Sequence, residues 1–332
     1  MSAAARLLAL ALLCAGPRPD ALADLAAVLD GAGALQPLET VLVARHGETL
    51  AARGYRGHGV DDPTNIKSAS KAIVSALTGI AIDRGVIADV GQPIAPLLDD
   101  LLPADADPQH RQITIGHLLS MQAGLARTSG RYYGRWIISD HWARAALARP
   151  FVEAPGGRML YSTGSTHLLS VILTRTSGRS TLDLARDWLG PVDGFRIDHW
   201  QQDPQGYYFG GNQMTMTPRS LLAFGELYRR GGVTAGGERV LPADWIERSW
   251  TPRTESRFTG DDYGYGWFVR DIAGERVAYA WGLGGQMLYV VPALGITAVM
   301  TSDDARPSGR TGHRDELHRL MGDILQALDD GA

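Results

Sequence analysis

The chain has 332 residues, of which 45% are hydrophobic and 20% are charged, and its formal net charge is −4 at pH 7. This length is sufficient to bury the core of one large domain or of two closely joined ones. The slightly acidic balance lacks the positive charge that attracts nucleic acids and anionic membranes, so neither is expected as a partner.

The first 23 residues are expected to be an export signal. A short segment with one positive charge precedes the apolar run LLALALLCAG, and a small-x-small pattern follows at 21–23. The apolar run is too short to span a bilayer as a helix, so no membrane span is expected in the mature chain, 24–332. The only cysteine, Cys14, lies in this segment, so the mature chain would have no disulfide. We therefore expect a periplasmic or secreted protein; the alternative is that these residues form an N-terminal helix.

From about residue 39, two short apolar segments flank His46-Gly47-Glu48 and predict a β-hairpin. The run RHGET (45–49) also resembles the opening signature of the histidine phosphatases, whose His becomes phosphorylated. That family needs a second His at the end of a buried strand late in the chain. His313 and His318 lie instead in an amphipathic helical pattern, so we interpret His46 as a turn residue.

The remaining elements alternate in type along the chain. Residues 68–84 carry apolar side chains at the helical period and end at Gly85, which predicts a central, buried helix. Residues 86–200 are predominantly helical, and 216–232 is another amphipathic helix. Four predicted strands follow, namely YGWFVR, RVAYAW, QMLYVV and ITAVMT, and then a final helix at 313–330.

This order predicts an α+β fold, in which a mostly antiparallel sheet is flanked by helices and a helical domain is inserted. The N- and C-terminal strands are expected to share one sheet. The α/β part is placed at about 24–85 and 200–332, and the helical part at about 86–200.

The use of lysine is unusual. Lys67 and Lys71 are the only two lysines in the chain, and all other basic residues are arginine. Lys71 lies one helical turn after Ser68, on the same face, and a lysine among apolar residues can lose its proton and activate a serine hydroxyl. The alternative is a Ser helix cap with a solvent-facing Lys, and we expect Lys67 to be such a solvated residue.

Two further stretches could complete a site. Tyr161, in the sequence LYSTG, could relay protons to a leaving group, or could be a half-buried core tyrosine. The run AWGLGGQ (280–286) could let a substrate approach an edge strand and supply backbone N–H groups to an oxyanion hole, or could be a glycine-rich hairpin.

In this order, Ser68-x-x-Lys71, Tyr161-Ser-Thr and the glycine-rich strand before VVP resemble the serine β-lactamase and penicillin-binding-protein superfamily. The likeness is greatest to its class C branch, which includes family VIII carboxylesterases and 6-aminohexanoate-dimer hydrolases. It covers nearly the whole mature chain, with the supporting phrases NIKSASKAIVSALTGIAIDRGVI, ITIGHLLSMQAGL, GGNQMTMTPRSLLAFGELY and GYGWFVR.

The resemblance implies a set of roles. Ser68 would accept the acyl group, Lys71 and Tyr161 would be the general acid/base pair, and the N–H groups of Ser68 and Leu283 would form the oxyanion hole. No metal or cofactor is implied. A small ester or amide would be hydrolysed through an acyl-enzyme. Thr163, Trp281 and Gly282 fall at positions that contact substrate.

Two departures from the family pattern bear on the substrate. Thr163 replaces the usual Asn, and the usual Lys or His of the third motif is absent, whether Ala280 or Trp281 occupies its place. Because β-lactams and D-Ala-D-Ala peptides carry a carboxylate, loss of that cation favours neutral, apolar substrates. A β-lactamase or D-Ala-D-Ala carboxypeptidase is the alternative, with Arg131 or Arg135 as the cation. The third possibility is a non-catalytic penicillin-binding-like sensor.

Overall fold

The computed structural model describes residues 18–329, and an eight-stranded antiparallel sheet forms its centre. The strand order is β2-β1-β11-β10-β9-β8-β7-β6, so strands from the two ends of the chain are neighbours, as the sequence predicts. The bounds are β1 Leu38–Arg45, β2 Glu48–Gly54, β6 Thr254–Glu255, β7 Asp262–Tyr263, β8 Phe268–Ile272, β9 Glu275–Gly282, β10 Gln286–Val291 and β11 Ile296–Ser302.

A second, three-stranded antiparallel sheet lies beside the first and has the order β3-β5-β4. Its strands are β3 Thr64–Asn65, β4 His199–Trp200 and β5 Met214–Met216. This small sheet brings residue 65, just before the central helix, into register with residue 215 of a distant part of the chain.

The β1–β2 hairpin turns at His46, which has a positive φ of 52°, and Gly47, with φ 91°. The His46 backbone N–H donates to the carbonyl oxygen of Gly295 at 2.7 Å. The interpretation of His46 as a turn residue is therefore confirmed.

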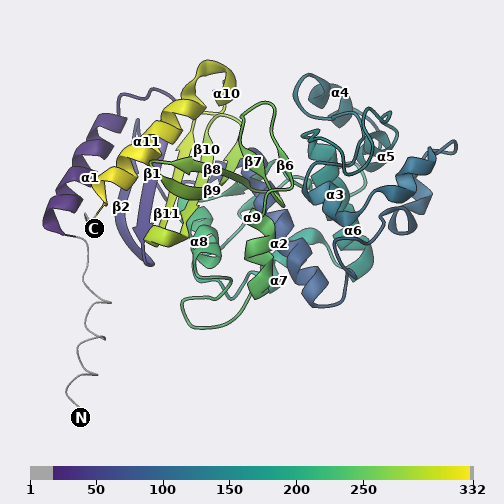
Figure 1. Ribbon diagram of the computed structural model, residues 1–332, viewed down its shortest axis with the longest axis horizontal. Coiled ribbons are helices and arrows are strands. Elements are labelled where there is room, and N and C mark those ends of the chain that lie inside the picture. The colour runs from purple at the N-terminus through teal and green to yellow at the C-terminus, as the bar shows by residue number, and fades with distance from the viewer. Residues whose placement is uncertain (1–17, 330–332) are drawn as a thin grey trace, which may run out of the picture.

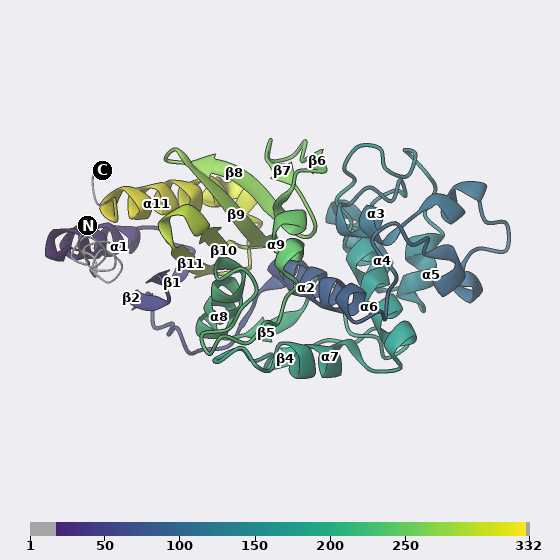
Figure 2. The same cartoon turned by 60° about the horizontal axis from the view of Figure 1, so that its bottom comes forward.

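Helices cover both faces of the large sheet. Figure 1 shows α1 and α11 side by side on one face, and Figure 2 shows α8 on the other. One buried cluster joins Leu25 and Leu29 of α1 to Leu317 of α11 and to alternate residues of the strands. The α-helices are α1 Pro19–Ala32, α2 Ser70–Asp83, α3 Ile115–Leu119, α4 Tyr133–Ile137, α5 Trp142–Leu147, α6 Thr163–Ser177, α7 Thr181–Trp188, α8 Pro218–Arg229, α9 Ala243–Trp250, α10 Ser308–Thr311 and α11 His313–Ala327.

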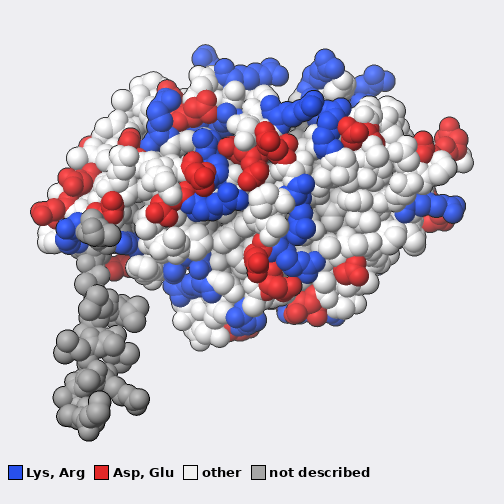
Figure 3. Space-filling model, in the orientation of Figure 1, with Lys and Arg blue, Asp and Glu red and all other residues white. Residues whose placement is uncertain are grey.

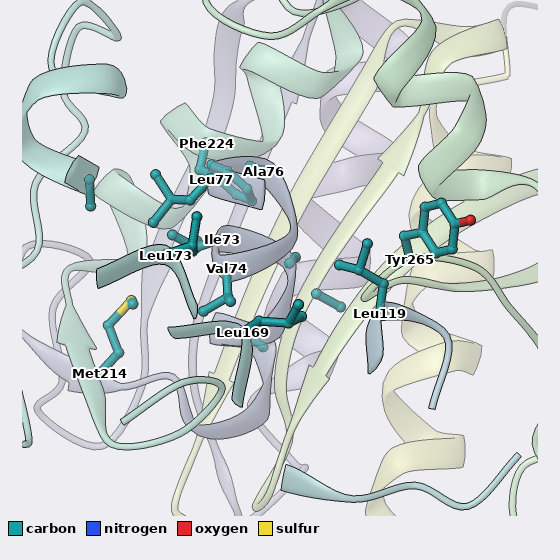
Figure 4. Close-up of a cluster of buried hydrophobic side chains, with 14 of the residues drawn as sticks. Ile73, Val74, Ala76, Leu77, Leu119, Leu169, Leu173, Met214, Phe224 and Tyr265 are labelled. Carbon is teal, nitrogen blue, oxygen red and sulfur yellow. The ribbon is translucent and has the colours of Figure 1, made fainter. Parts of the chain in front are cut away.

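Helix α2 is buried along nearly its whole length, as its sequence predicts. Every residue from Ser70 to Ala81 is buried. In Figure 4 its side chains Ile73 and Leu77 lie among residues from α6, α8 and β5. It follows one 3₁₀ turn, η2 Lys67–Ala69, so the α-helix itself begins two residues later than residue 68. The other 3₁₀ turns are η3 Ala95–Leu97, η4 Asp99–Leu101, η5 Pro108–Gln112, η6 Gly130–Tyr132 and η7 Pro292–Leu294.

Helices α3 to α6 lie on the side of α2 that is away from the large sheet (Figure 1), and α7 lies near β4 of the small sheet (Figure 2). The domain boundaries near 85 and 200 stay a prediction. The expected export segment lies mostly outside the described residues, but the cleavage point after Ala23 falls within α1, where Ala21 is buried.

Acidic and basic side chains are interspersed over the face seen in Figure 3. Within residues 18–329, no helix combines the length and the apolar character needed to cross a membrane.

Candidate active site

Ser68 lies in the middle of the η2 turn, at the entrance to α2, and its side chain is partly exposed. The residue before it, Lys67, has a positive φ of 50°, a conformation that side chains other than glycine seldom adopt. Two hydrogen bonds hold this turn: the Lys67 N–H donates to Oδ1 of Asn65 at 3.0 Å, and Oγ of Ser70 donates to the Lys67 carbonyl at 2.7 Å. The strained turn therefore presents the Ser68 hydroxyl outward from a buried helix.

Lys71 is buried beneath that hydroxyl, with 1% of its surface exposed. Its Nζ lies 2.9 Å from Oγ of Ser68, 3.3 Å from Oγ1 of Thr163 and 2.7 Å from the carbonyl oxygen of Gly211. No carboxylate of the described chain forms an ion pair with it, and burial lowers its pKa to about 7. A substantial fraction of Lys71 is therefore neutral near pH 7 and can accept the Ser68 proton.

Tyr161 lies two residues before α6 and is a hydrogen-bond partner of Ser68. Burial raises its pKa to about 12, an increase that a hydrogen bond with Ser68 partly offsets. Nζ of Lys71 lies 5.1 Å from the centre of its ring, which also stacks against Phe268. Because Tyr161 keeps its proton at neutral pH, the site pairs a base with an acid around one hydroxyl.

The third predicted motif, the glycine-rich run 280–286, also lies at the turn that carries Ser68. Strand β9 ends at Gly282, where an added Cβ would lie only 2.3 Å from the carbonyl oxygen of Ile66. The end of β9 therefore packs directly on the turn that carries Ser68. Leu283 follows in the β9–β10 turn and is 48% exposed. The structure thus brings residues 68, 71, 161 and 282 together, as the sequence predicts.

The two other predicted substrate contacts lie in different surroundings. Thr163 is 3% exposed, and its hydroxyl bonds Ser129 at 2.9 Å, so it belongs to the network around Lys71. Trp281 is partly exposed, donates from Nε1 to Oγ of Ser308 at 3.2 Å and stacks on Phe258. Contact of either residue with substrate stays a prediction.

Lys67 differs from its expected state. Its side chain is 18% exposed and its Nζ lies 2.7 Å from a carboxylate oxygen of Asp304. The expectation of a solvated Lys was wrong because Asp304 follows strand β11 in the sequence, more than two hundred residues later, and only the fold brings it beside the turn. The contact of Lys71 with the Gly211 carbonyl was not predicted either, because these residues are also far apart in the sequence. The adjacent glycines at 210–211 were the one local sign of a close backbone approach.

The described residues contain no cluster of three or more His, Cys, Asp or Glu side chains arranged to hold a metal ion. The side chains that interact with the Ser68 hydroxyl are those of Lys71 and Tyr161, and Thr163 bonds Lys71 in turn. This set suits proton transfer to and from a serine hydroxyl.

The family model described as Beta-lactamase matches residues 31–322. The chain belongs to the beta-lactamase family. No curated protein sequence matches this beta-lactamase family member.

Solved structures resemble this beta-lactamase family member over most of its length. A family VIII carboxylesterase matches with a TM-score of 0.72 at 14% identity, over 95% of this chain and 99% of that one. A penicillin-binding protein homologue from Caulobacter crescentus matches with a TM-score of 0.72 at 18% identity, with the same two coverages. A D-stereospecific amidohydrolase from Streptomyces sp. matches with a TM-score of 0.66 at 17% identity, over 93% and 99% of the two chains. These likenesses establish the fold.

Proposed function

We propose that this protein is a serine hydrolase that cleaves small esters or amides through an acyl-enzyme on Ser68. One observation carries the proposal: the buried Lys71, which has no ion-pair partner among the described residues, lies 2.9 Å from the partly exposed Ser68 hydroxyl. A lysine in this setting is a base near neutral pH and costs stability, which fits a catalytic role better than a structural one.

Acylation begins when neutral Lys71 accepts the Ser68 proton and Oγ attacks the substrate carbonyl carbon. The resulting oxyanion would be held by the N–H groups of Ser68 and Leu283. The first lies in the initial turn of a helix, where N–H groups lack intrahelical acceptors. Tyr161 then protonates the leaving alcohol or amine as the carbonyl re-forms. The proton taken up by Lys71 returns to Tyr161, which restores both groups.

Deacylation reverses these roles with water as the nucleophile. The Lys71–Tyr161 pair accepts a proton from water, and the hydroxide equivalent attacks the acyl carbon. Oγ of Ser68 leaves and regains its proton, and a carboxylic acid is released.

The exposed side chains near the end of β9 favour an apolar substrate. Phe258 is 62% exposed and stacks on Trp281 with ring centres 6.2 Å apart, and Leu283 is also exposed. Trp281 and Leu283 flank Gly282, which packs on the turn that carries Ser68, and exposed aromatic and aliphatic side chains in such a place suit an acyl or alcohol group without charge. We propose that Trp281 and Gly282 contact this group and that Thr163 acts on it through Lys71.

Export through residues 1–23, to the periplasm or the medium, belongs to the same proposal. It is supported by the sequence pattern at the N-terminus. Fractionation of the producing cells, with mass measurement of the released protein, tests it; an intact N-terminus in the cytoplasmic fraction would refute it.

Hydrolysis of p-nitrophenyl butyrate tests the function. Wild-type protein should release nitrophenol, and Ser68→Ala should release none above the buffer rate. Ser75→Ala is the matched control, because Ser75 lies in the same helix and its buried hydroxyl has no hydrogen-bond partner among the described residues. Wild-type activity in Ser68→Ala, or inert wild type with both this ester and short amides, would overturn the proposal.

A further inference from the structure

A buried ionisable pair lies behind the site and has no part in the chemistry above. His167, in α6, and Asp203, in the loop between β4 and β5, are both 0% exposed in their side chains. Nε2 of His167 lies 3.0 Å from Oδ2 of Asp203. Removing two such polar groups from water is costly, so their retention in a core calls for an explanation.

Asp203 is held as a carboxylate. Burial alone would raise its pKa, but hydrogen bonds from His167 and from backbone N–H groups outweigh this and keep the pKa below its ordinary value. The backbone donors are the N–H groups of Gln205 and Tyr207, each 2.9 Å from Oδ1. A carboxylate can only accept hydrogen bonds, so Nε2 of His167 carries the proton that faces it.

The tautomer of His167 follows from this contact. With the proton on Nε2, Nδ1 has a free lone pair, and the N–H of Gly210 donates to it at 3.4 Å. The rings of Trp136, Trp142 and Phe209 surround His167, with centres 5.9, 5.7 and 5.8 Å away. The two hydrogen bonds and the surrounding rings therefore fix the orientation and the tautomer of the imidazole.

Gly211, the residue after Gly210, connects the His167 imidazole to the active site. Gly210 presses on α6 so closely that an added Cβ would lie 2.2 Å from the carbonyl oxygen of Thr166. Gly211 has φ +81°, and its carbonyl accepts from Nζ of Lys71 at 2.7 Å. A continuous chain of contacts thus runs from Asp203 through His167 to Lys71.

We propose that Asp203 and His167 are positioning residues, which hold the Gly211 carbonyl against Lys71 and so keep Lys71 directed at Ser68. The role of Lys71 as base rests on the proposed function above. The geometric part, that Asp203 sets the His167 tautomer and the Gly210–Gly211 backbone, does not depend on it.

The variant Asp203→Asn changes the hydrogen bonding to His167 with little change in the shape of the side chain. Its amide oxygen can still accept from the backbone, but its NH₂ group now donates toward Nε2 of His167. His167 must then move its proton to Nδ1, which meets the N–H of Gly210 as donor against donor. The loop at 210–211 should loosen while the core stays filled.

Two activity-independent NMR measurements test the geometry. In ¹⁵N-histidine-labelled protein, His167, identified by His167→Gln, should be the Nε2–H tautomer in wild type and the Nδ1–H tautomer in Asp203→Asn. With ¹⁵Nζ-lysine labelling the chain gives only two signals, since it has two lysines. The Lys71 signal should shift more in the variant than the Lys67 signal, because Lys67 Nζ is held chiefly by Asp304 at 2.7 Å and only by a longer contact to Gln213 at 3.4 Å.

Kinetics test the consequence for the reaction. Asp203→Asn should lower kcat for ester hydrolysis by about 10- to 100-fold with little change in KM. A misdirected Lys71 slows proton transfer from Ser68 but leaves the residues that bind the substrate in place. The matched control is Glu226→Gln, the same carboxylate-to-amide change in an ion pair with Arg229 on α8, which should keep kcat within about twofold.

The possible outcomes separate the two claims. An unchanged tautomer and an unchanged Lys71 signal in Asp203→Asn would overturn the positioning proposal, as would a kcat no lower than that of Glu226→Gln. Absence of hydrolase activity in the wild-type protein would instead refute the proposed function. The two NMR signals would still decide whether Asp203 and His167 position Lys71.

Discussion

At the scale of single residues, Lys71 and Tyr161 have environments that shift their pKa values in opposite directions. Burial lowers the pKa of Lys71 to about 7 and raises that of Tyr161 to about 12. Both shifts have one cause, which is that a charged form is disfavoured where water is excluded. At neutral pH the lysine can therefore accept a proton and the tyrosine can donate one.

Replacing Lys71 by Met should abolish turnover yet stabilise the fold at low pH. An unfolded lysine has a pKa of about 10.4, so between pH 7 and 10 the unfolded wild type binds more protons than the folded one. Wild-type stability therefore gains with rising pH in that window, and Lys71→Met lacks this gain. The free energy of unfolding of Lys71→Met, measured in urea at pH 6, 8 and 10, should exceed that of the wild type by the largest amount at pH 6 and by the smallest at pH 10.

Lys67→Met is the control for that change, because it is the other lysine and pairs with Asp304 near the surface. An advantage of Lys71→Met that grew with pH, or a loss of stability at pH 6, would mean that Lys71 is not held neutral by burial. In wild type, kcat should rise as the pH rises through about 7, where Lys71 loses its proton.

Tyr161→Phe should keep the fold and lower kcat by about 10²- to 10⁴-fold, because the ring still packs against Phe268 but the leaving group receives no proton. Comparison of a nitrophenyl ester with an alkyl ester of the same acid measures this. The loss should be larger for the alkyl ester, whose alcohol is the poorer leaving group. Equal losses for both would argue against Tyr161 as the acid.

At the scale of elements, the site depends on the contact between the end of β9 and the η2 turn. Gly282 is the residue at that contact, because a Cβ there would lie 2.3 Å from the carbonyl oxygen of Ile66 and 3.0 Å from Cβ of Lys67. Since the carbonyl belongs to the backbone, only movement of a strand or of the turn could relieve the overlap.

Gly282→Ala should therefore lower activity by about 100-fold or more while the protein stays folded, since a shift of about 1 Å displaces Ser68 from its partners. Circular dichroism and p-nitrophenyl butyrate hydrolysis measure the two effects. Gly31→Ala is the control, because Gly31 lies in α1, has no left-handed backbone conformation and has nothing within 4 Å of an added Cβ. A fully active Gly282→Ala variant would show that β9 does not set the position of Ser68.

At the scale of the whole molecule, the site lies between two packed regions. One core joins the sheet to α1 and α11, and the other joins it to α2, α8 and the helices beyond. Ala69 and Ala72, the neighbours of Ser68 and Lys71 in the sequence, belong to the second region, whereas Tyr161 and Trp281 pack against the first. The proposed acid and base are thus supplied by different layers of the molecule.

Much of this arrangement could be predicted from local sequence. The hairpin at His46, the buried helix after Ser68 and the C-terminal strands follow from periodicity and glycine positions. The partners Asp304, Gly211 and Asp203 could not be predicted, because each joins the site through a contact that only the tertiary fold makes. Lys67 was misread for that reason.

Removal of residues 1–23 should leave a folded, active protein. Cleavage there shortens α1 but keeps Leu25 and Leu29, which pack in the core with α11. Thermal unfolding and ester hydrolysis of 24–332 should match the full chain closely. Removal of 1–32 is the contrasting deletion and should lower Tm, since it takes away both leucines. An unfolded 24–332 protein would indicate that α1 is needed intact, which contradicts cleavage after Ala23.

The most direct measurement is intact-mass spectrometry of the protein mixed briefly with p-nitrophenyl butyrate, followed by peptide mapping. The account predicts a transient butyryl adduct on the peptide that contains Ser68, present in wild type and Ser75→Ala and absent in Ser68→Ala. An adduct on another residue, or nitrophenol release that persists in Ser68→Ala, would contradict it.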